Sequence, residues 1–178
     1  MRQFTQHLQV SSVRRVTVSD YDSAWPARFA ELRSRMVPVL GNIAVAIEHV
    51  GSTSVPGLAA KPIIDMDVVV ASAGEVRLAI ERLAALGYVH QGNLGIEGRE
   101  AFVSPPGLHA HHLYVCVRGG AALQNHLQVR DYLRRHADAA ATYGRLKKTL
   151  AECVPDDIEK YMSGKTDFLA GVLRSGCA

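Results

Sequence analysis

Apolar residues near the start of the chain recur with the spacing of an amphipathic helix. Asp22 or Ser23 is suited to cap this helix, Pro26 fits its first turn, and Gly41 stops it after about Leu40. A short run of β-branched residues, 13–18, comes before it and predicts a strand. The opening of the chain is therefore expected to be a strand followed by a helix.

Two further β-branched runs predict the centre of a sheet. Residues 45–50 lead into Gly51, and residues 62–70 follow a connection of small and polar residues at 51–61. Residues 73–86 return to helical spacing and stop at a glycine. The order predicted for this part is strand, loop, strand and helix.

The rest of the chain divides into short strands and then helices. Strands are predicted at 88–90, 99–104 and 109–117, with a hairpin or mobile loop at 91–98 and a turn at 105–107, and helices at 123–136, 139–153 and about 155–174. We expect one α/β (α+β) domain, with a mixed-sheet core over about residues 13–118 and a C-terminal helical layer over about 119–178.

Composition places the chain among ordinary globular proteins. Of its 178 residues, 48% are hydrophobic and 21% are charged, and no apolar run is long enough to cross a bilayer. The first residues lack the apolar centre of a signal peptide. We therefore expect a cytoplasmic protein without a membrane partner. Cys116, Cys153 and Cys177 are odd in number and lack Cys-x-x-Cys spacing, so neither a disulfide framework nor a structural zinc site is supported and free thiols are expected.

Net charge alone does not indicate nucleic-acid binding. The formal value is +3, but basic residues gather between 130 and 148. They are Arg130, Arg134, Arg135, Arg145, Lys147 and Lys148. Such a face suits phosphates or an acidic partner. The alternative is a solvated helix surface on which Asp131 pairs with Arg135 at i,i+4.

Two aspartates interrupt the β-branched run at 62–70. Side chains alternate along a strand, so Asp65 and Asp67 are expected on the same face. Two adjacent carboxylates repel each other unless protons or a cation lie between them, and oxygen ligands of this kind suit Mg²⁺ or Mn²⁺. The structural alternative is that one aspartate accepts hydrogen bonds from the loop at 51–61 while the other pairs with an arginine.

The loop before these aspartates is rich in hydrogen-bond donors. Backbone N–H groups and the hydroxyls of Ser52, Thr53 and Ser54 are suited to hold phosphates, and Gly51 lets a ligand approach closely. A simple strand-exit turn is the alternative interpretation. Lys61 is placed to neutralise phosphate charge or to be solvated. His49 is expected on the same side of its strand as Gly51, either facing the pocket or within the core.

These features together resemble known families. A strand ending in Gly-Ser, followed after a short connection by Asp-hydrophobic-Asp, is similar to the signature of the nucleotidyltransferase superfamily. The longer string GSTSVPGLAAKPIID resembles the GrpB family, as do the blocks YDSAW, HHLYV, VRDYL and YGRLK at 21–25, 111–115, 129–133 and 143–147. The resemblance implies a nucleotidyltransferase-like fold and a link to dephospho-coenzyme A kinase, to which some family members are fused. The resemblance does not imply a particular reaction, because the family has no settled one.

The resemblance also directs attention to the strand at 109–117. An active nucleotidyltransferase carries a third carboxylate on a neighbouring strand, and none is evident here, because the family pattern resembles HHLHV at that place. Tyr114 replaces the second histidine of that pattern. The two-residue period puts His112 and Tyr114 on one face and His109 and His111 on the other, so His112 is the candidate ligand or base.

Further candidates lie outside the two central motifs. Arg99 is expected to face phosphate, while Arg130 and Asp131 are expected to bind phosphate or orient other groups. The pairs Tyr143/Lys147 and Tyr161/Lys165 recur at i,i+4, which predicts packed tyrosines beside solvated lysines.

Three functions are compatible with these residues. The leading hypothesis is a nucleotidyltransferase that binds a nucleoside triphosphate through Ser52, Lys61 and a metal on Asp65 and Asp67, and transfers a nucleotidyl group to an unknown acceptor. The second is a non-catalytic nucleotide- or coenzyme A-related binding module that assists a kinase. The third is metal-dependent phosphohydrolysis by the histidine strand. The acceptor, the nucleotide and the oligomeric state are left open.

Overall fold

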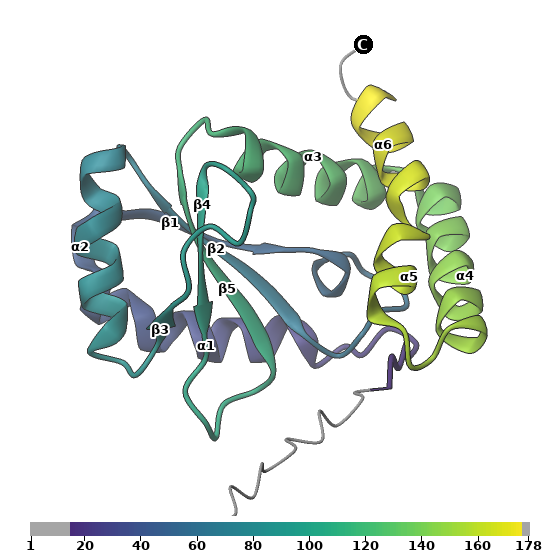
Figure 1. Ribbon diagram of the computed structural model, residues 1–178, viewed down its shortest axis with the longest axis horizontal. Helices are drawn as coiled ribbons and strands as arrows, with labels where there is room; N and C mark the ends of the chain where they lie inside the picture. Colours follow the sequence, from purple (N-terminus) through teal and green to yellow (C-terminus); the bar gives the residue numbers. More distant parts are fainter. Residues whose placement is uncertain (1–14, 176–178) are drawn as a thin grey trace, which may run out of the picture.

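A mixed five-stranded sheet forms the centre of the computed structural model, which describes residues 15–175 (Figure 1). The strands are β1 (Ala44–Val50), β2 (Ile64–Val70), β3 (Val89–His90), β4 (Arg99–Val103) and β5 (His111–Val117), in the order β1-β2-β5-β4-β3. Only the central pair, β2 and β5, is parallel. This arrangement confirms the predicted α/β class with a mixed sheet.

Within residues 15–175, six α-helices accompany the sheet: α1 (Trp25–Leu40), α2 (Ala73–Ala84), α3 (Ala121–Arg135), α4 (Ala137–Cys153), α5 (Ile158–Ser163) and α6 (Thr166–Ser175). Figure 1 shows α1 and α3 running along opposite sides of the sheet, with α4, α5 and α6 gathered at one end. Two 3₁₀ turns, η1 (Gly41–Ile43) and η2 (Ser52–Ser54), lie on either side of β1. No helix among the described residues is long and apolar enough to cross a membrane.

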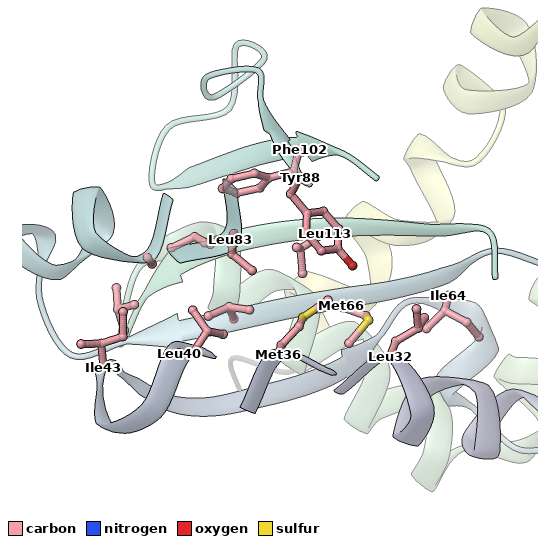
Figure 2. Close-up of a cluster of buried hydrophobic side chains, with 14 of the residues drawn as sticks. Leu32, Met36, Leu40, Ile43, Ile64, Met66, Leu83, Tyr88, Phe102 and Leu113 are labelled. Carbon is pink, nitrogen blue, oxygen red and sulfur yellow. The ribbon is translucent and has the colours of Figure 1, made fainter. Parts of the chain in front are cut away.

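The central strand β2 separates an apolar face from a polar one. Ile64, Met66, Val68 and Val70 are buried in the main core, where they pack with α1 and α2 residues such as Met36 and Leu83 (Figure 2). Burying these side chains supplies most of the favourable free energy of this layer. Because side chains alternate, the intervening residues of β2 project toward α3.

A second, smaller core joins the helical layer to the connection between β1 and β2. Val55 and Leu58 from that connection are buried against Leu133 of α3 and Tyr143 of α4. The loop after β1 is therefore packed between the sheet and the C-terminal helices. This packing fixes where the candidate phosphate loop lies.

Several predicted boundaries differ from the structure. The strand predicted at 13–18 is wrong for its described part: residues 15–18 form no strand, and the chain makes only an isolated bridge between Ser19 and Ala60. Residues 13–14 lie outside the described range. Strands β2 and β5 each begin two residues later than predicted, and the helix predicted from about 155 to 174 is divided into α5 and α6 at Gly164.

Candidate functional site

The sheet register brings the two aspartates together with the histidine strand. Asp65 lies opposite His112 and Asp67 lies opposite Tyr114, because β2 and β5 pair in parallel. On the other side, Val50 and Glu48 of β1 pair with Asp65 and Asp67 respectively. Paired residues project from the same face, so the structure confirms that both acids, His112 and Tyr114 share one surface.

Each aspartate is bound to its own histidine. Asp65 Oδ1 is 2.9 Å from His112 Nδ1, and Asp67 Oδ2 is 2.8 Å from Nδ1 of His126 on α3. The His112 side chain is 48% exposed, whereas Asp67 is fully buried. The prediction that His112 faces the acids is confirmed. His126 was missed, since nothing in the local sequence indicates which side of α3 packs on the sheet.

The environment of Asp67 makes it an unusual carboxylate. Burial raises the pKa of Asp67, while its hydrogen bond with His126 opposes that shift. Burial also disfavours the charged form of His126, but the hydrogen bond and charge of Asp67 outweigh it and raise the pKa of His126. Asp67 Oδ1 is buried and has no hydrogen-bond partner among the residues that the structure describes. A buried acceptor of this kind is costly unless a donor or a cation reaches it.

Gly51 is required by the aspartate beside it. Its φ is +67°, and a Cβ built there would lie 2.1 Å from Asp65 Oδ2. The sequence predicted that glycine at this position allows close approach of a ligand. In the structure, the group that approaches is the Asp65 carboxylate, so the turn and the acid are fixed together.

Three successive residues of the loop are held from three different elements. The Lys147 ammonium on α4 donates to Ser52 Oγ at 2.7 Å. The Thr53 hydroxyl is 3.0 Å from His49 Nε2. The Ser54 carbonyl accepts two N–H groups of Arg134, at 3.0 and 2.8 Å. The side chain of Ser52 therefore points toward the helical layer, while Thr53 and Ser54 are anchored elsewhere.

Two lysines of the helical layer are withdrawn from solvent in this region: Lys147 is buried and Lys165 is half-buried. Lys147 is 2% exposed, and burial together with the charge of Lys165 lowers its pKa to about 7. Burial and the charge of Lys61 lower the pKa of Lys165 to about 8. Lys147, Lys165 and Lys61 form no ion pair with a carboxylate within the described range.

The prediction of a solvated lysine is therefore wrong for Lys147, whereas Lys165 is half-buried. The ammonium of Lys147 lies 4.5 Å from the ring centroid of Tyr143, and that of Lys165 lies 4.7 Å from the centroid of Tyr161. Lys61 approaches the same Tyr161 ring at 5.5 Å. The tyrosines pack as predicted, but their rings support cations that face inward.

A cleft of about 380 Å³ lies between the sheet and the helical layer. Of the predicted site residues, its lining includes Gly51, Ser52, Lys61, Asp65, Arg99, His112 and Tyr114. Residues that the sequence did not single out complete it, among them Asn125, His126, Val129, Met162, Lys165 and Leu169. The guanidinium of Arg99 stacks on Tyr114, 4.4 Å from the ring centroid. The lining thus combines an aspartate and two histidines, Asp65, His112 and His126, with two lysines, Lys61 and Lys165.

Other predicted candidates do not line this cleft, and Asp67, Thr53 and Ser54 are among them. Arg130 forms ion pairs with Glu48 and Asp131, both at 2.7 Å, and also donates to the His49 carbonyl. Asp131 thus orients Arg130 and does not pair with Arg135, whose Nε donates to the Asp131 carbonyl. Through these contacts Arg130 connects α3 to β1 and has a structural role.

For His49 the structure confirms the core alternative, and the ring does not face the cleft. Its ring stacks on Phe29 at 4.7 Å and lines a different cavity, because the strand ends at Val50 and the positive φ of Gly51 breaks the two-residue alternation. Burial lowers the pKa of His49 to about 4, so the ring is neutral near pH 7.

No complete metal cage is present among the described residues. No three His, Cys, Asp or Glu side chains there are grouped to hold an ion. Glu48 lies across from Asp67 but is neutralised by Arg130, so it does not supply the missing third carboxylate. The residues present nevertheless fit Mg²⁺ or Mn²⁺ delivered with a phosphate, because Asp67 Oδ1 lacks a partner and Mg²⁺ ordinarily takes only one or two protein carboxylates.

Comparison with known proteins identifies the family. The family model described as "GrpB protein" matches residues 15–175. The chain belongs to the GrpB family. The UPF0157 protein YqkA of Bacillus subtilis is 40% identical over 156 residues, which cover 88% of this chain and 46% of YqkA. The chain thus spans about half the length of that relative.

A solved GrpB structure and a more distant fold relative extend this result. The conserved protein GrpB from Enterococcus faecalis has a TM-score of 0.81 and 37% identity, covering 90% of this chain and 96% of that one. The Cid1 poly(U) polymerase has a TM-score of 0.52 and 13% identity, covering 76% of this chain and 43% of Cid1. The GrpB fold is therefore distantly similar to that of a nucleotidyltransferase.

A dephospho-CoA kinase of Mycolicibacterium paratuberculosis is also similar to this chain. It is 25% identical over 198 residues, covering 96% of this chain and 49% of the kinase sequence. The matched region is about half of that relative.

Replacing Gly51 should distort the site. We expect Gly51→Ala to lower the free energy of unfolding by at least about 2 kcal/mol, because the new Cβ meets Asp65 and the positive φ is strained. Gly57→Ala is the control: its φ is +77° but nothing lies within 4 Å of its Cβ, so about 1 kcal/mol is expected. Urea unfolding of both variants measures the difference. Equal losses would show that Asp65 imposes no additional constraint.

Lys147 should make stability depend on pH in a defined direction. Its folded-state pKa of about 7 lies below its ordinary value of 10.5, so the unfolded chain binds more protons between these values. The contribution of Lys147 to stability therefore rises as pH increases through this window. Relative to Lys147→Met, the wild-type melting temperature should rise from about pH 6 to about pH 9.5. If the difference in melting temperature between the wild type and Lys147→Met is constant across this pH range, Lys147 does not have the lowered pKa expected of a buried lysine.

Proposed function

We propose that this GrpB protein binds a nucleoside triphosphate with Mg²⁺ or Mn²⁺ in the cleft and transfers a nucleotidyl group to an acceptor. The observation that carries the proposal is the placement of Lys61 and Lys165, without carboxylate partners in the described structure, on the lining of a cleft that also holds Asp65. Lys147 lies behind this lining and reaches it through Ser52, and Asp67 is buried beside Asp65 in the sheet. Like charges held close together destabilise each other unless an anion lies between them. A polyphosphate that carries a divalent cation satisfies both walls at once.

Each group has a separate role in this proposal. Asp65, which lines the cleft, and the Oδ1 of Asp67 behind it, partnerless in the described structure, would hold the metal, which would supply charge stabilisation at the phosphates. Ser52 and the lysines bind the outer phosphates, and Arg99 supplies a further guanidinium at the sheet wall. The apolar wall formed by Val129, Met162 and Leu169 is suited to the nucleoside.

His112 is suited to take the proton of the acceptor. Its Nδ1 faces the Asp65 carboxylate at 2.9 Å, which favours the tautomer that leaves Nε2 as a proton acceptor. Its exposed position at the cleft makes it accessible to a second substrate. In this assignment His112 acts where the missing third carboxylate would act in other nucleotidyltransferases, as a general base.

A second candidate function is binding without turnover. The similarity to a dephospho-CoA kinase over nearly the whole of this chain favours a nucleotide- or coenzyme A-related module that assists a kinase. The same lysines would then bind a phosphorylated ligand, and no metal chemistry would be required. The two functions share the cleft and differ in whether a bond is broken.

One experiment separates the two functions. The purified protein is incubated with a labelled panel of nucleoside triphosphates, Mg²⁺ or Mn²⁺, and a cell extract that supplies acceptors. Released pyrophosphate together with a labelled acceptor supports transfer. Saturable binding without pyrophosphate supports the module, and absence of binding over the whole panel overturns both.

Asp65→Asn should remove the metal-dependent part of binding. Metal and triphosphate together should raise the melting temperature more than either alone, because both bind the native cleft. The amide conserves volume and removes the ligand charge, so the synergy should disappear while stability without ligand stays equal or rises. Asp138→Asn, an exposed change in the first turn of α4, is the control. A destabilised Asp65→Asn protein with intact synergy would favour a purely structural aspartate.

A further inference from the structure

A second cavity lies on the other side of the loop that follows β1. Its volume is about 550 Å³, and its polar lining consists of Tyr21, His49, Ser54 and Arg134. The remaining walls are apolar or small, formed by two prolines, a glycine, three alanines and Leu133. This cavity is separate from the proposed nucleotide site, because Asp65, Ser52 and the lysines of the cleft are absent from its lining.

The cavity carries one positive charge, that of Arg134, and no negative charge. No acidic side chain lines it, and Arg134 forms no ion pair with a carboxylate in the described structure. The nearby acids Glu48 and Asp131 are paired with Arg130 instead. Arg134 uses Nε and Nη2 to hold the Ser54 carbonyl. A guanidinium has five N–H donors, so its Nη1 group is still able to bind an oxyanion.

We propose that this cavity binds a small organic anion that carries one carboxylate and an apolar body. One permanent cation faces the cavity, which matches a single negative charge. The His49 ring, stacked on Phe29, and the Tyr21 side chain offer hydrogen-bonding groups around that position. The alanines and Leu133 leave space for apolar atoms, which gain free energy when they leave water.

The position of the cavity links it to the phosphate loop. Thr53 is bound by His49 and Ser54 by Arg134, and both of these side chains line the second cavity. Leu133 lines both cavities. A ligand that contacts Arg134 therefore changes how Ser54 is held, and through it the orientation of Ser52 in the cleft. The expected effect on nucleotide affinity rests on the proposed function, whereas carboxylate binding does not.

Binding of simple carboxylates tests the site directly. The probes are benzoate and butyrate, compared with the uncharged benzamide and butyramide, and binding is followed by amide chemical shifts in ¹⁵N-labelled protein. Benzoate and butyrate should shift the backbone amide signals of His49, Ser54 and Ala140 in a saturable manner. Benzamide and butyramide should leave these signals unchanged. Equal binding of the charged and uncharged probes, or no carboxylate shifts at these residues, would overturn the proposal.

Variants separate the site from general effects. Arg134→Gln should weaken benzoate binding by about tenfold or more, the effect expected when a hydrogen bond to a charged group is lost. Arg135→Gln is the matched control, because Arg135 is the adjacent exposed arginine and lies outside the cavity lining. Unchanged benzoate affinity in Arg134→Gln would contradict the proposal.

A cavity-filling variant covers the case in which Arg134→Gln does not fold. Ala141→Phe occupies the space from an exposed helical position and leaves the guanidinium in place, so it should abolish benzoate binding while the melting temperature is maintained. Retained binding would place the carboxylate elsewhere. Benzoate binding without any nucleotide binding would overturn the proposed function alone, and nucleotide binding without benzoate binding would overturn the second site alone.

Discussion

The contact between the Lys147 ammonium and the Ser52 hydroxyl joins the two halves of this molecule. Ser52 belongs to the turn that leaves the central sheet, and Lys147 belongs to the C-terminal helical layer. An almost fully buried lysine without an acidic partner in the described structure is unfavourable by itself. Its ammonium lies 4.5 Å from the Tyr143 ring centroid, and Tyr143 packs with Val55 and Leu58 of the loop in the same small core. The cleft exists because the helices hold this cation over the end of β1.

Opposite charges are kept on opposite walls of that cleft. Asp65 lines the sheet wall with His112 and His126, while Asp67 is buried behind it and bound to His126. Lys165 lines the helical wall, and Lys147 lies behind Ser52; burial lowers the pKa of both lysines. Within the described residues these lysines form no ion pair with either aspartate, so in our proposal a ligand bridges the two walls. A divalent cation bound to a polyphosphate has the required distribution, with positive charge for one wall and negative charge for the other. This match is what connects the GrpB fold to nucleotide chemistry in our account.

Local periodicity predicted the sheet part of the site and failed for the helical part. The two-residue alternation placed Asp65, Asp67 and His112 on one face, and these positions follow from backbone geometry alone. Lys147, Lys165 and His126 depend on how helices pack against the sheet, which no local pattern determines. The i,i+4 tyrosine–lysine pairs were the available signal, but a solvated lysine was the simpler interpretation. The direction of His49 could not be decided from this alternation, because a positive φ at Gly51 ends it.

Proton uptake on nucleotide binding tests the central claim most directly. A polyphosphate beside Lys147 favours its charged form and raises its pKa from about 7, so the complex should bind additional protons near pH 8. Calorimetric titration of a nucleoside triphosphate and Mg²⁺ in buffers of different ionisation enthalpy measures this uptake. Our account predicts uptake in the wild type and in the surface variant Lys148→Met, and a clear reduction in Lys147→Met. The same uptake in Lys147→Met, or no saturable heat with any triphosphate, would contradict it.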